Sequence, residues 1–230
     1  KHFVSKDAFN IEGFGKKIVE NFWELNLVKY PQDIFKLNYN KVESLEGWGR
    51  QSVANLMHSI NERKSISFER FIYSLGIRHI GIENAKLIVK NFKSMSNFLY
   101  LVENKNYQDL LNIDGIGETQ VNSIKNFFSN KTNLKVFNEL RKTIDIKYTK
   151  RKKDGHLNNK TFMLTGKLHE MSRAEAKSLI EENSGSIVST VSKKLDYLIV
   201  GEKPTKRKVN AAKELKVGIL NQNDLLKILK

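Results

Sequence analysis

The chain has 230 residues, and 40% of them are hydrophobic, which is enough for one large or two smaller folded domains and excludes a wholly disordered protein. It contains no cysteine, so disulfides and thiolate metal sites within it are excluded. Its formal net charge of +15 fits either compositional drift, because Lys and Asn are heavily used, or a polyanionic partner, and charge alone does not separate the two. Its apolar runs are shorter than the ~18 residues that a membrane span needs.

Four segments share one pattern, which is an apolar residue, a Gly-apolar-Gly turn and then an amphipathic helix. They are residues 9–22, 43–56, 76–89 and 111–124, and their last glycines are Gly15, Gly49, Gly81 and Gly117. These glycines lie 34, 32 and 36 residues apart, a regularity that indicates an internal repeat. Apolar residues follow each glycine at the i, i+3, i+4, i+7 spacing of a helix with one buried face. Residues 1–143 are therefore predicted to be all-α, with four helical hairpins.

The turn of each repeat has the chemistry of a phosphate site. Glycine has no Cβ, so it adopts positive φ and lets another backbone approach closely. A helix that begins directly after the turn leaves its first amides without partners, and the positive end of its dipole suits a phosphate oxygen. We therefore predict DNA binding through the turn glycines and nearby basic side chains. These are Gly13, Gly15, Lys16, Lys17, Gly47, Gly49, Arg50, Gly76, Arg78, Gly81, Gly115 and Gly117.

The alternative is that the glycines only cap helices and close tight turns. That interpretation is the stronger one for a single Gly-x-Gly, because short motifs often match by chance. Four copies in register favour the phosphate site. The first three hairpins have a basic residue near the turn, whereas the fourth has Glu118 instead, so its phosphate contact is the least secure of the four.

The stretches HFVSKDAFNIEGFG, LEGWGRQSVANL and RFIYSLGIRHIG resemble the tandem helix-hairpin-helix domain of bacterial NAD-dependent DNA ligases. The third hairpin departs from strict Gly-apolar-Gly and reads GIRHIG over residues 76–81, a variant that is usual in that family. The resemblance implies that residues 1–143 grip duplex DNA across the minor groove near a nick.

The charge is densest at residues 141–154, which carry seven basic and two acidic side chains. A charge-rich stretch with few large apolar residues is typical of a linker, so we expect a basic linker at residues 144–157. Residues 152–155 also match K-x-D-G, the motif whose lysine is adenylated in nucleotidyltransferases. Because a motif needs its structural context, and Lys152 stands among other cations in a linker, we reject that role for it.

From residue 159 the pattern changes to alternating strands and helices. Strands are expected at residues 161–165, 187–188, 197–200 and 218–220, and helices from Ser172, at residues 206–215 and at 223–229. Ser172 and Glu175 have the spacing of a capping box, which opens the first of these helices. The order βαββαβα predicts a small parallel sheet flanked by helices.

The segments LTGKL, SRAEAKSLIEENSG and VSKKLDYLIVGEK resemble a BRCT domain, which we place at residues 158–230. Some BRCT domains bind a phosphate through a Thr/Ser-Gly pair after the first strand and a lysine on the second helix. The resemblance carries that role to Thr165, Gly166 and Lys208. The alternative, in which Thr165 only ends a strand and Lys208 is only solvated, stays open.

Together the resemblances imply a two-domain protein, an all-α tandem helix-hairpin-helix domain followed by a small α/β BRCT domain. They imply the non-catalytic C-terminal part of an NAD-dependent DNA ligase that seals nicks in replication and repair. The first residue is Lys1, which fits a piece of a longer chain. We expect no catalytic residue, metal or cofactor here, with NAD, Mg²⁺ and Zn²⁺ belonging to the parent ligase.

The expected partners are nicked double-stranded DNA and the other ligase domains, and we expect a monomer in the bacterial cytoplasm, associated with the nucleoid. The competing hypothesis is a non-enzymatic repair scaffold whose hairpins hold DNA while its BRCT domain holds a protein or a phosphate. The order of the two domains favours the ligase, because repair polymerases that use both place BRCT first.

Overall fold

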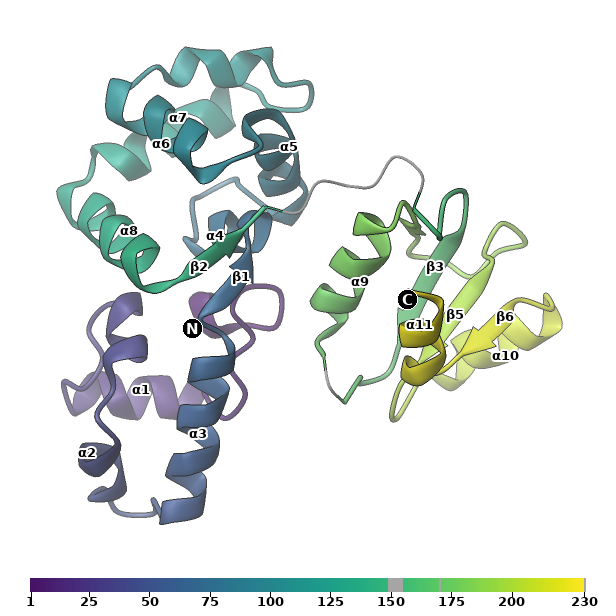
Figure 1. Cartoon of the computed structure of the whole chain (residues 1–230), viewed down its shortest axis with the longest axis horizontal. Helices are drawn as coiled ribbons and strands as arrows, with labels where there is room; N and C mark the ends of the chain where they lie inside the picture. Colours follow the sequence, from purple (N-terminus) through teal and green to yellow (C-terminus); the bar gives the residue numbers. More distant parts are fainter. Residues whose placement is uncertain (149–154, 170, 230) are drawn as a thin grey trace. The chain divides into compact units, whose positions relative to one another are not determined.

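The computed structural model describes residues 1–148, 155–169 and 171–229 (Figure 1). The chain divides into two compact units, Lys1–Tyr148 and Thr149–Lys230, each with its own hydrophobic clusters. Within the described residues, every helix is too short or too polar to cross a membrane.

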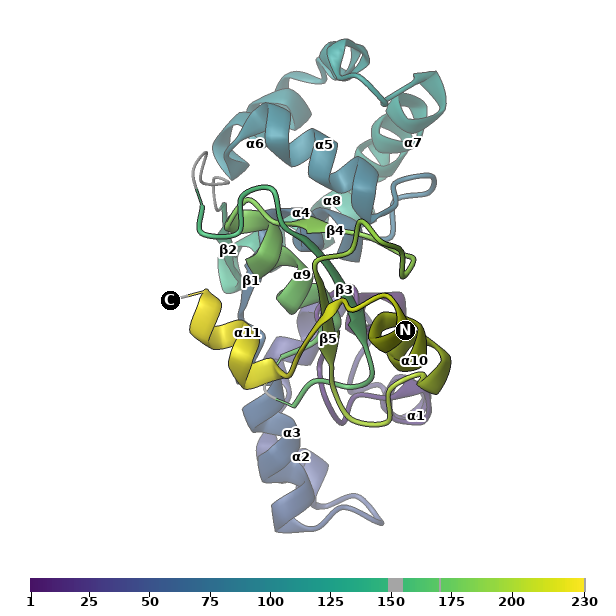
Figure 2. The same cartoon turned by 90° about the vertical axis from the view of Figure 1, so that its right-hand side faces the viewer.

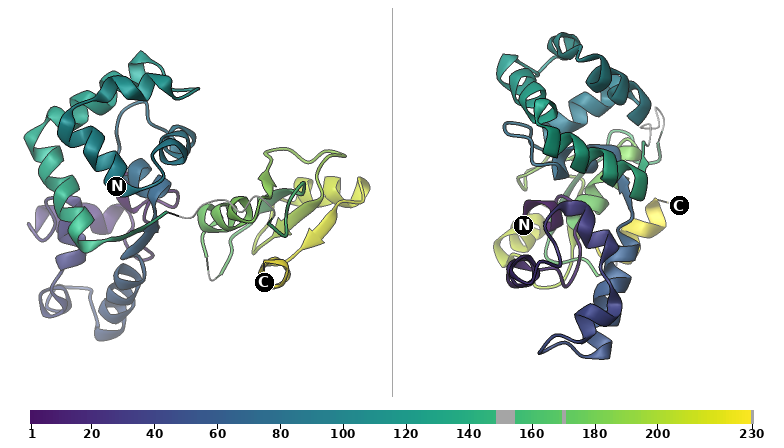
Figure 3. Two further views of the ribbon diagram at one scale, coloured as in Figure 1. Left: turned by 45° about the horizontal axis from the view of Figure 1, so that its top comes forward. Right: turned by 90° about the vertical axis from the view of Figure 1, so that its left-hand side faces the viewer.

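The first unit consists of two groups of helices joined by a short pair of strands (Figures 1 and 3). The first group contains η1 (His2–Val4), α1 (Lys16–Glu24), η2 (Pro31–Lys36), α2 (Tyr39–Glu43) and α3 (Arg50–Glu62). The second group contains α4 (Phe68–Ser74), α5 (Ile82–Phe92), α6 (Met95–Asn104), η3 (Tyr107–Asn112), α7 (Glu118–Ser129) and α8 (Lys131–Thr143). The strands are β1 (Ser65–Ser67) and β2 (Asp145–Lys147).

Aromatic side chains fill the core of this unit, as the helical spacing of the apolar residues predicts. Phe98 is fully buried and makes edge contacts with Phe68 and Phe128 at ring-centroid distances of 5.9 and 5.8 Å. In the first group, Phe22 contacts Phe14 at 5.6 Å and Trp48 at 5.5 Å. The buried apolar residues of both groups belong to one continuous cluster, so the four hairpins share a core.

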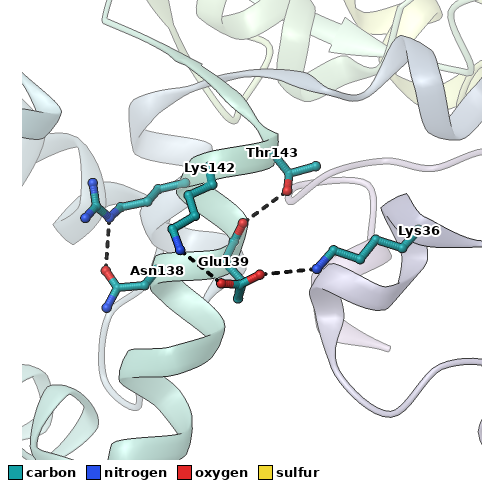
Figure 4. A network of polar contacts seen from close by, with 6 residues as sticks. Lys36, Asn138, Glu139, Lys142 and Thr143 are labelled. Atoms are coloured by element: carbon teal, nitrogen blue, oxygen red, sulfur yellow. Dashed lines mark hydrogen bonds and ion pairs between the residues drawn. The ribbon is translucent and has the colours of Figure 1, made fainter.

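Polar contacts also join the two groups. Arg70 of α4 is buried and donates hydrogen bonds to the carbonyl oxygens of Ala8 and Lys6, which fixes the segment after η1. On the other side, the Glu139 carboxylate of α8 accepts hydrogen bonds from Lys36 of η2 and from Lys142, both at 3.2 Å (Figure 4). These contacts orient one pair of hairpins against the other.

The prediction that this region is entirely helical misses the strand pair. β1 and β2 run parallel, with Ile66 opposite Ile146, and Ile144 is only 5% exposed. Such a pairing joins residues some 80 positions apart, which local propensity does not reveal.

The predicted linker at residues 144–157 is too long at both ends. Residues 144–147 end α8 and form β2, so they belong to the first unit. Leu157 is buried in the second unit, where its amide donates to Asn183 O at 3.1 Å. Residues 149–154, with Lys152 of the K-x-D-G match, lie outside the described residues.

The second unit is a four-stranded parallel sheet flanked by helices, which confirms the predicted βαββαβα order. Its elements are β3 (Thr161–Thr165), α9 (Arg173–Glu182), β4 (Ser186–Ile187), β5 (Tyr197–Val200), α10 (Lys206–Glu214), β6 (Gly218–Leu220) and α11 (Gln222–Ile228). The strand order is β4-β3-β5-β6. Alternate residues of β3 point to opposite faces, where α9 and α11 cover Phe162 and α10 covers Met163 (Figure 2).

The capping box predicted for α9 is present. The Glu175 amide donates to Ser172 Oγ at 3.1 Å, and the Ser172 amide donates to Glu175 Oε2 at 2.7 Å. Asn221 and Asp224 exchange the same pair of bonds at the start of α11, at 3.0 and 3.1 Å. These two helices therefore satisfy their first amides with their own side chains, unlike the helices that follow the first three hairpins.

Candidate nucleic-acid interface

The four hairpins of the first unit close through the same backbone hydrogen bond. In each, the apolar residue directly before the last glycine donates its amide to the carbonyl of the residue three positions earlier. The pairs are Phe14–Ile11, Trp48–Leu45, Ile80–Ile77 and Ile116–Ile113, at 3.2, 3.1, 3.1 and 3.0 Å. Six of these eight side chains are buried, and the other two, Leu45 and Trp48, are partly buried and pack against the core, so apolar anchors hold every turn.

The third residue of each turn has positive φ, which is the conformation that a type II turn requires. The residues are Gly13, Gly47, His79 and Gly115, with φ of 80°, 80°, 61° and 87°. Gly76, which was predicted as the first glycine of the third hairpin, instead follows α4, where its amide donates to Tyr73 O. His79 is thus a hairpin residue that the sequence analysis missed.

A signal for His79 was available in the spacing. Counting two residues back from Gly15, Gly49, Gly81 and Gly117 gives Gly13, Gly47, His79 and Gly115. Histidine is one of the few residues besides glycine that is enriched at positive φ. Its carbonyl accepts a hydrogen bond from Asn84 Nδ2 at 2.9 Å, which fixes this turn to α5, and the imidazole is exposed beside Arg78.

The second glycine of each hairpin is the N-cap of the following helix and has an extended backbone. The φ values of Gly15, Gly49, Gly81 and Gly117 are −71°, −100°, −78° and −108°, which any residue adopts. A methyl group at Gly15, Gly49 or Gly81 would meet no atom of the described residues within 4 Å. Neither backbone conformation nor internal packing therefore explains glycine at these three positions, and this argues against the interpretation as mere caps.

The helices behind these glycines present unpaired amides to solvent. In α1 the first backbone bond within the helix runs from Val19 N to Gly15 O, at 3.0 Å. Consequently the amides of residues 16–18 find no acceptor among the described residues, and α3 and α5 begin in the same way at Gly49 and Gly81. Exposed amides at the positive end of a helix dipole form an anion site, and a chain without Cβ lets a phosphate reach them.

Basic side chains stand beside the first three glycine turns. Lys16 and Lys17 are exposed on the first turn of α1, and Arg78 is exposed in the third hairpin. The Arg50 side chain is 91% exposed, and its Nε contacts Glu43 Oε1 at 3.2 Å. Because an exposed ion pair of this kind contributes little, Arg50 is available to an anion.

The fourth hairpin has the same turn with different surroundings. The Gly117 amide donates to Gln120 Oε1 at 3.2 Å, and the exposed Asp114 and Glu118 flank the turn. A methyl group at Gly115 would lie 2.9 Å from Leu87 Cδ1, so this turn also packs closely against α5. The prediction that Gly115 and Gly117 bind DNA has less support here than at the other hairpins.

In the second unit, the residues assigned to a phosphate pocket come together only in part. Thr165 is 2% exposed, and its Oγ1 accepts the amide of Thr205, the N-cap of α10, at 3.1 Å. This bond brings the end of β3 to the helix that carries Lys208. Gly166 has φ of 85°, and a methyl group there would lie 2.6 Å from Glu202 O. The hydroxyl and the glycine thus serve the fold, which weakens the predicted pocket.

Two protein families match the chain, one in each unit. Residues 70–137 match the helix-hairpin-helix motif, and residues 152–229 match the BRCA1 C Terminus (BRCT) domain. A DNA ligase of Pelagibacter ubique (strain HTCC1062) is 67% identical over 230 residues, which cover 100% of this chain and 34% of the ligase. Over its whole length the chain is thus similar to one part of that DNA ligase. The predicted resemblance to part of a bacterial DNA ligase is confirmed.

More distant DNA ligases match over the same extent. That of Rickettsia canadensis (strain McKiel) is 39% identical over 242 residues, covering 100% of this chain and 35% of the ligase. That of Wolbachia pipientis subsp. Culex pipiens (strain wPip) is 43% identical over 227 residues, covering 96% and 35%. The chain therefore spans about a third of the length of these relatives. The helix-hairpin-helix match begins at residue 70, yet the two hairpins before it repeat the same turn.

Proposed function

We propose that this chain is the DNA-holding region of an NAD-dependent DNA ligase and binds nicked duplex DNA through its sugar–phosphate backbone. The observation that carries the proposal is the set of exposed, unpartnered helix amides behind Gly15, Gly49 and Gly81, at positions where the protein itself does not need glycine. Backbone contacts of this kind position DNA without reading its sequence.

The remaining steps of the parent reaction fall outside this chain. The parent ligase would transfer AMP from NAD and join a 5′-phosphate to a 3′-hydroxyl with Mg²⁺. This sequence has no cysteine for a zinc finger, and the described residues hold no cluster of three or more metal-ligating side chains. We propose that NAD, Mg²⁺ and Zn²⁺ belong to the other ligase domains and that the isolated chain is inactive in sealing.

The similarity to DNA ligases over the whole chain supports a ligase over a non-enzymatic repair scaffold. We further propose a monomeric protein of the bacterial cytoplasm that acts on DNA in replication and repair. The BRCT unit adds exposed cations at the start of α10, Lys206 and Arg207, but the contacts of Thr165 give no support to a phosphate reader there.

The test is a salt titration of binding between the full chain and a fluorescein-labelled nicked duplex, followed by fluorescence anisotropy. If the hairpins engage about 4–8 phosphates, log K against log salt falls with a slope of roughly −4 to −7. Duplexes of unrelated sequence are expected to bind with similar affinity. A slope near zero would overturn the proposal.

A matched pair of double variants ties the binding to the hairpins. Lys16→Ala with Lys17→Ala should make the slope shallower by about 2, because each phosphate contact contributes about 0.9. Lys90→Ala with Lys93→Ala removes the same charge at the far end of a hairpin helix and should leave the slope nearly unchanged. Equal losses in the two variants would mean that diffuse charge, and not the hairpin turn, binds the DNA.

A further inference from the structure

The four hairpins share one backbone turn but differ in whether a side chain accepts a hydrogen bond from the amide of the N-cap glycine. In the fourth hairpin, Gln120 Oε1 accepts the Gly117 amide at 3.2 Å. The residues at the equivalent position of the other helices are Ile18, Ser52 and Asn84, and among the described residues none of them accepts the glycine amide. The Gln120 side chain therefore occupies a backbone amide at the start of α7 that the other three hairpins leave open among the described residues.

The negative charge of the fourth hairpin also disfavours a phosphate there. Residues 113–120 of the fourth hairpin carry Asp114 and Glu118 and no cation, for a formal charge of −2. The equivalent residues 11–18, 45–52 and 77–84 sum to +1, 0 and 0. A phosphate bound at this turn would lie within the screening length of about 10 Å at 0.1 M salt from both carboxylates, so salt would screen their repulsion only in part.

The fourth turn also packs against another helix of the protein. Gly115 lies against Leu87 of α5, which is the helix of the third hairpin, so close that a methyl group would be 2.9 Å from Leu87 Cδ1. The corresponding glycine of the first hairpin has an ordinary distance of 3.6 Å to Leu56 Cδ1, and that of the second has open space among the described residues. The fourth turn thus packs against another helix of the protein more closely than the first or second turn does.

We infer that three hairpins hold phosphates, and that Gln120 and Glu118 exclude phosphate from the fourth, which instead buttresses the third. This inference rests on the proposed function and defines which part of the first unit meets the DNA.

The test is a series of four matched variants, Gly15→Asp, Gly49→Asp, Gly81→Asp and Gly117→Asp. All four positions are exposed N-caps with extended backbones, and aspartate is among the best N-cap residues, so each variant should stay folded. At the first three positions, a carboxylate that caps the amides should lower duplex affinity about tenfold at ~0.1 M salt and make the salt slope shallower by about 1. Gly117→Asp should change affinity less than twofold.

A gain-of-contact variant tests the inference from the other side. Gln120→Ala combined with Glu118→Lys frees the Gly117 amide and raises the formal charge of residues 113–120 from −2 to 0, so the slope should steepen by about 1 and affinity should rise. The matched control, Glu103→Lys with Gln120 retained, makes the same charge change at an exposed position of α6 and should produce the smaller effect.

The outcomes separate the two claims. If Gly117→Asp weakens binding as much as Gly49→Asp, the fourth hairpin holds phosphate, and the inference fails while the proposed function stands. The inference also fails if the Gln120→Ala, Glu118→Lys variant binds no better than the Glu103→Lys control. If all four aspartate variants bind like the unmodified chain, the proposed function and the inference are both wrong.

Discussion

Glycine has a different role in each of the two units. In the second unit a methyl group at Gly201 would lie 2.1 Å from Lys167 O, and one at Gly185 would lie 2.6 Å from Ile180 Cγ2. In the first unit, Gly15, Gly49 and Gly81 have open space around them among the described residues. Packing therefore accounts for Gly185 and Gly201 of the second unit, whereas Gly15, Gly49 and Gly81 of the hairpins leave room for a partner.

The glycines of this protein thus fall into two kinds. A glycine that other backbone atoms crowd is part of the fold, and replacing it costs stability. A glycine with an extended backbone, open space and an exposed helix amide is part of a surface, and replacing it should cost binding instead. The same substitution thus has effects that can be measured independently in the two units.

The largest expected effect is that of Gly201→Ala. The added methyl group would overlap a backbone carbonyl, so the second unit should lose about 3 kcal/mol of unfolding free energy. Both tryptophans, Trp23 and Trp48, lie in the first unit. Urea unfolding followed by tryptophan fluorescence should therefore stay unchanged, while far-ultraviolet circular dichroism shows an early transition. A stability equal to that of the unmodified chain in both signals contradicts the packing explanation.

The next effect distinguishes two glycines of the second hairpin, Gly47 and Gly49. Gly47→Ala forces alanine to φ of 80° and should destabilise the first unit by about 1 kcal/mol, as measured by tryptophan fluorescence in urea. Gly49→Ser, two residues later, should keep or raise stability, because serine is a better N-cap, and should weaken DNA binding. If Gly49→Ser instead unfolds the protein more readily than Gly47→Ala, the assignment of the two glycines is reversed.

A comparable effect is expected for Asp196→Asn in the second unit. Hydrogen bonds from the Thr161 amide and hydroxyl, at 2.8 and 2.9 Å, lower the pKa of the Asp196 carboxyl, with a smaller contribution from Lys160. The variant should lose about 1 kcal/mol at neutral pH.

The pH dependence of Asp196 has a definite sign. Because the pKa is lower in the folded protein, the carboxylate stabilises it fully above the unfolded pKa of about 3.9, and this stabilisation disappears as the pH falls through the folded pKa. Circular dichroism melts at pH 7 and pH 3 should thus show a difference between variant and parent that shrinks on acidification. A difference that grows in acid would mean that another group is responsible.

The smallest effect is expected for Glu139→Gln in the first unit. Hydrogen bonds from Lys36 and Lys142 lower the pKa of the Glu139 carboxyl, yet all three side chains are accessible to water (Figure 4). The variant should lower the melting temperature slightly at neutral pH and low salt, and the difference should vanish in 1 M salt or in acid, because the folded pKa is the lower one. A shift that persists in high salt would indicate a hydrogen-bond role beyond charge.

Much of this protein follows from its sequence. The 3.6-residue spacing of apolar side chains predicts the hairpin helices, because each helix must bury one face. The recurrence of Gly15, Gly49, Gly81 and Gly117 predicts the number of hairpins. The Ser172–Glu175 capping box and the alternating apolar runs predict the second unit, because these signals are local.

The tertiary structure decided the rest. Strand β2 depends on pairing with β1, whose residues lie some 80 positions away, so no local signal separates it from a linker. The burial of the Thr165 hydroxyl against Thr205, and the contact of Gly115 with Leu87, depend on how distant segments pack. Sequence spacing shows where a glycine stands, but only the neighbours that folding brings to it determine whether its missing side chain makes room for the protein or for a ligand.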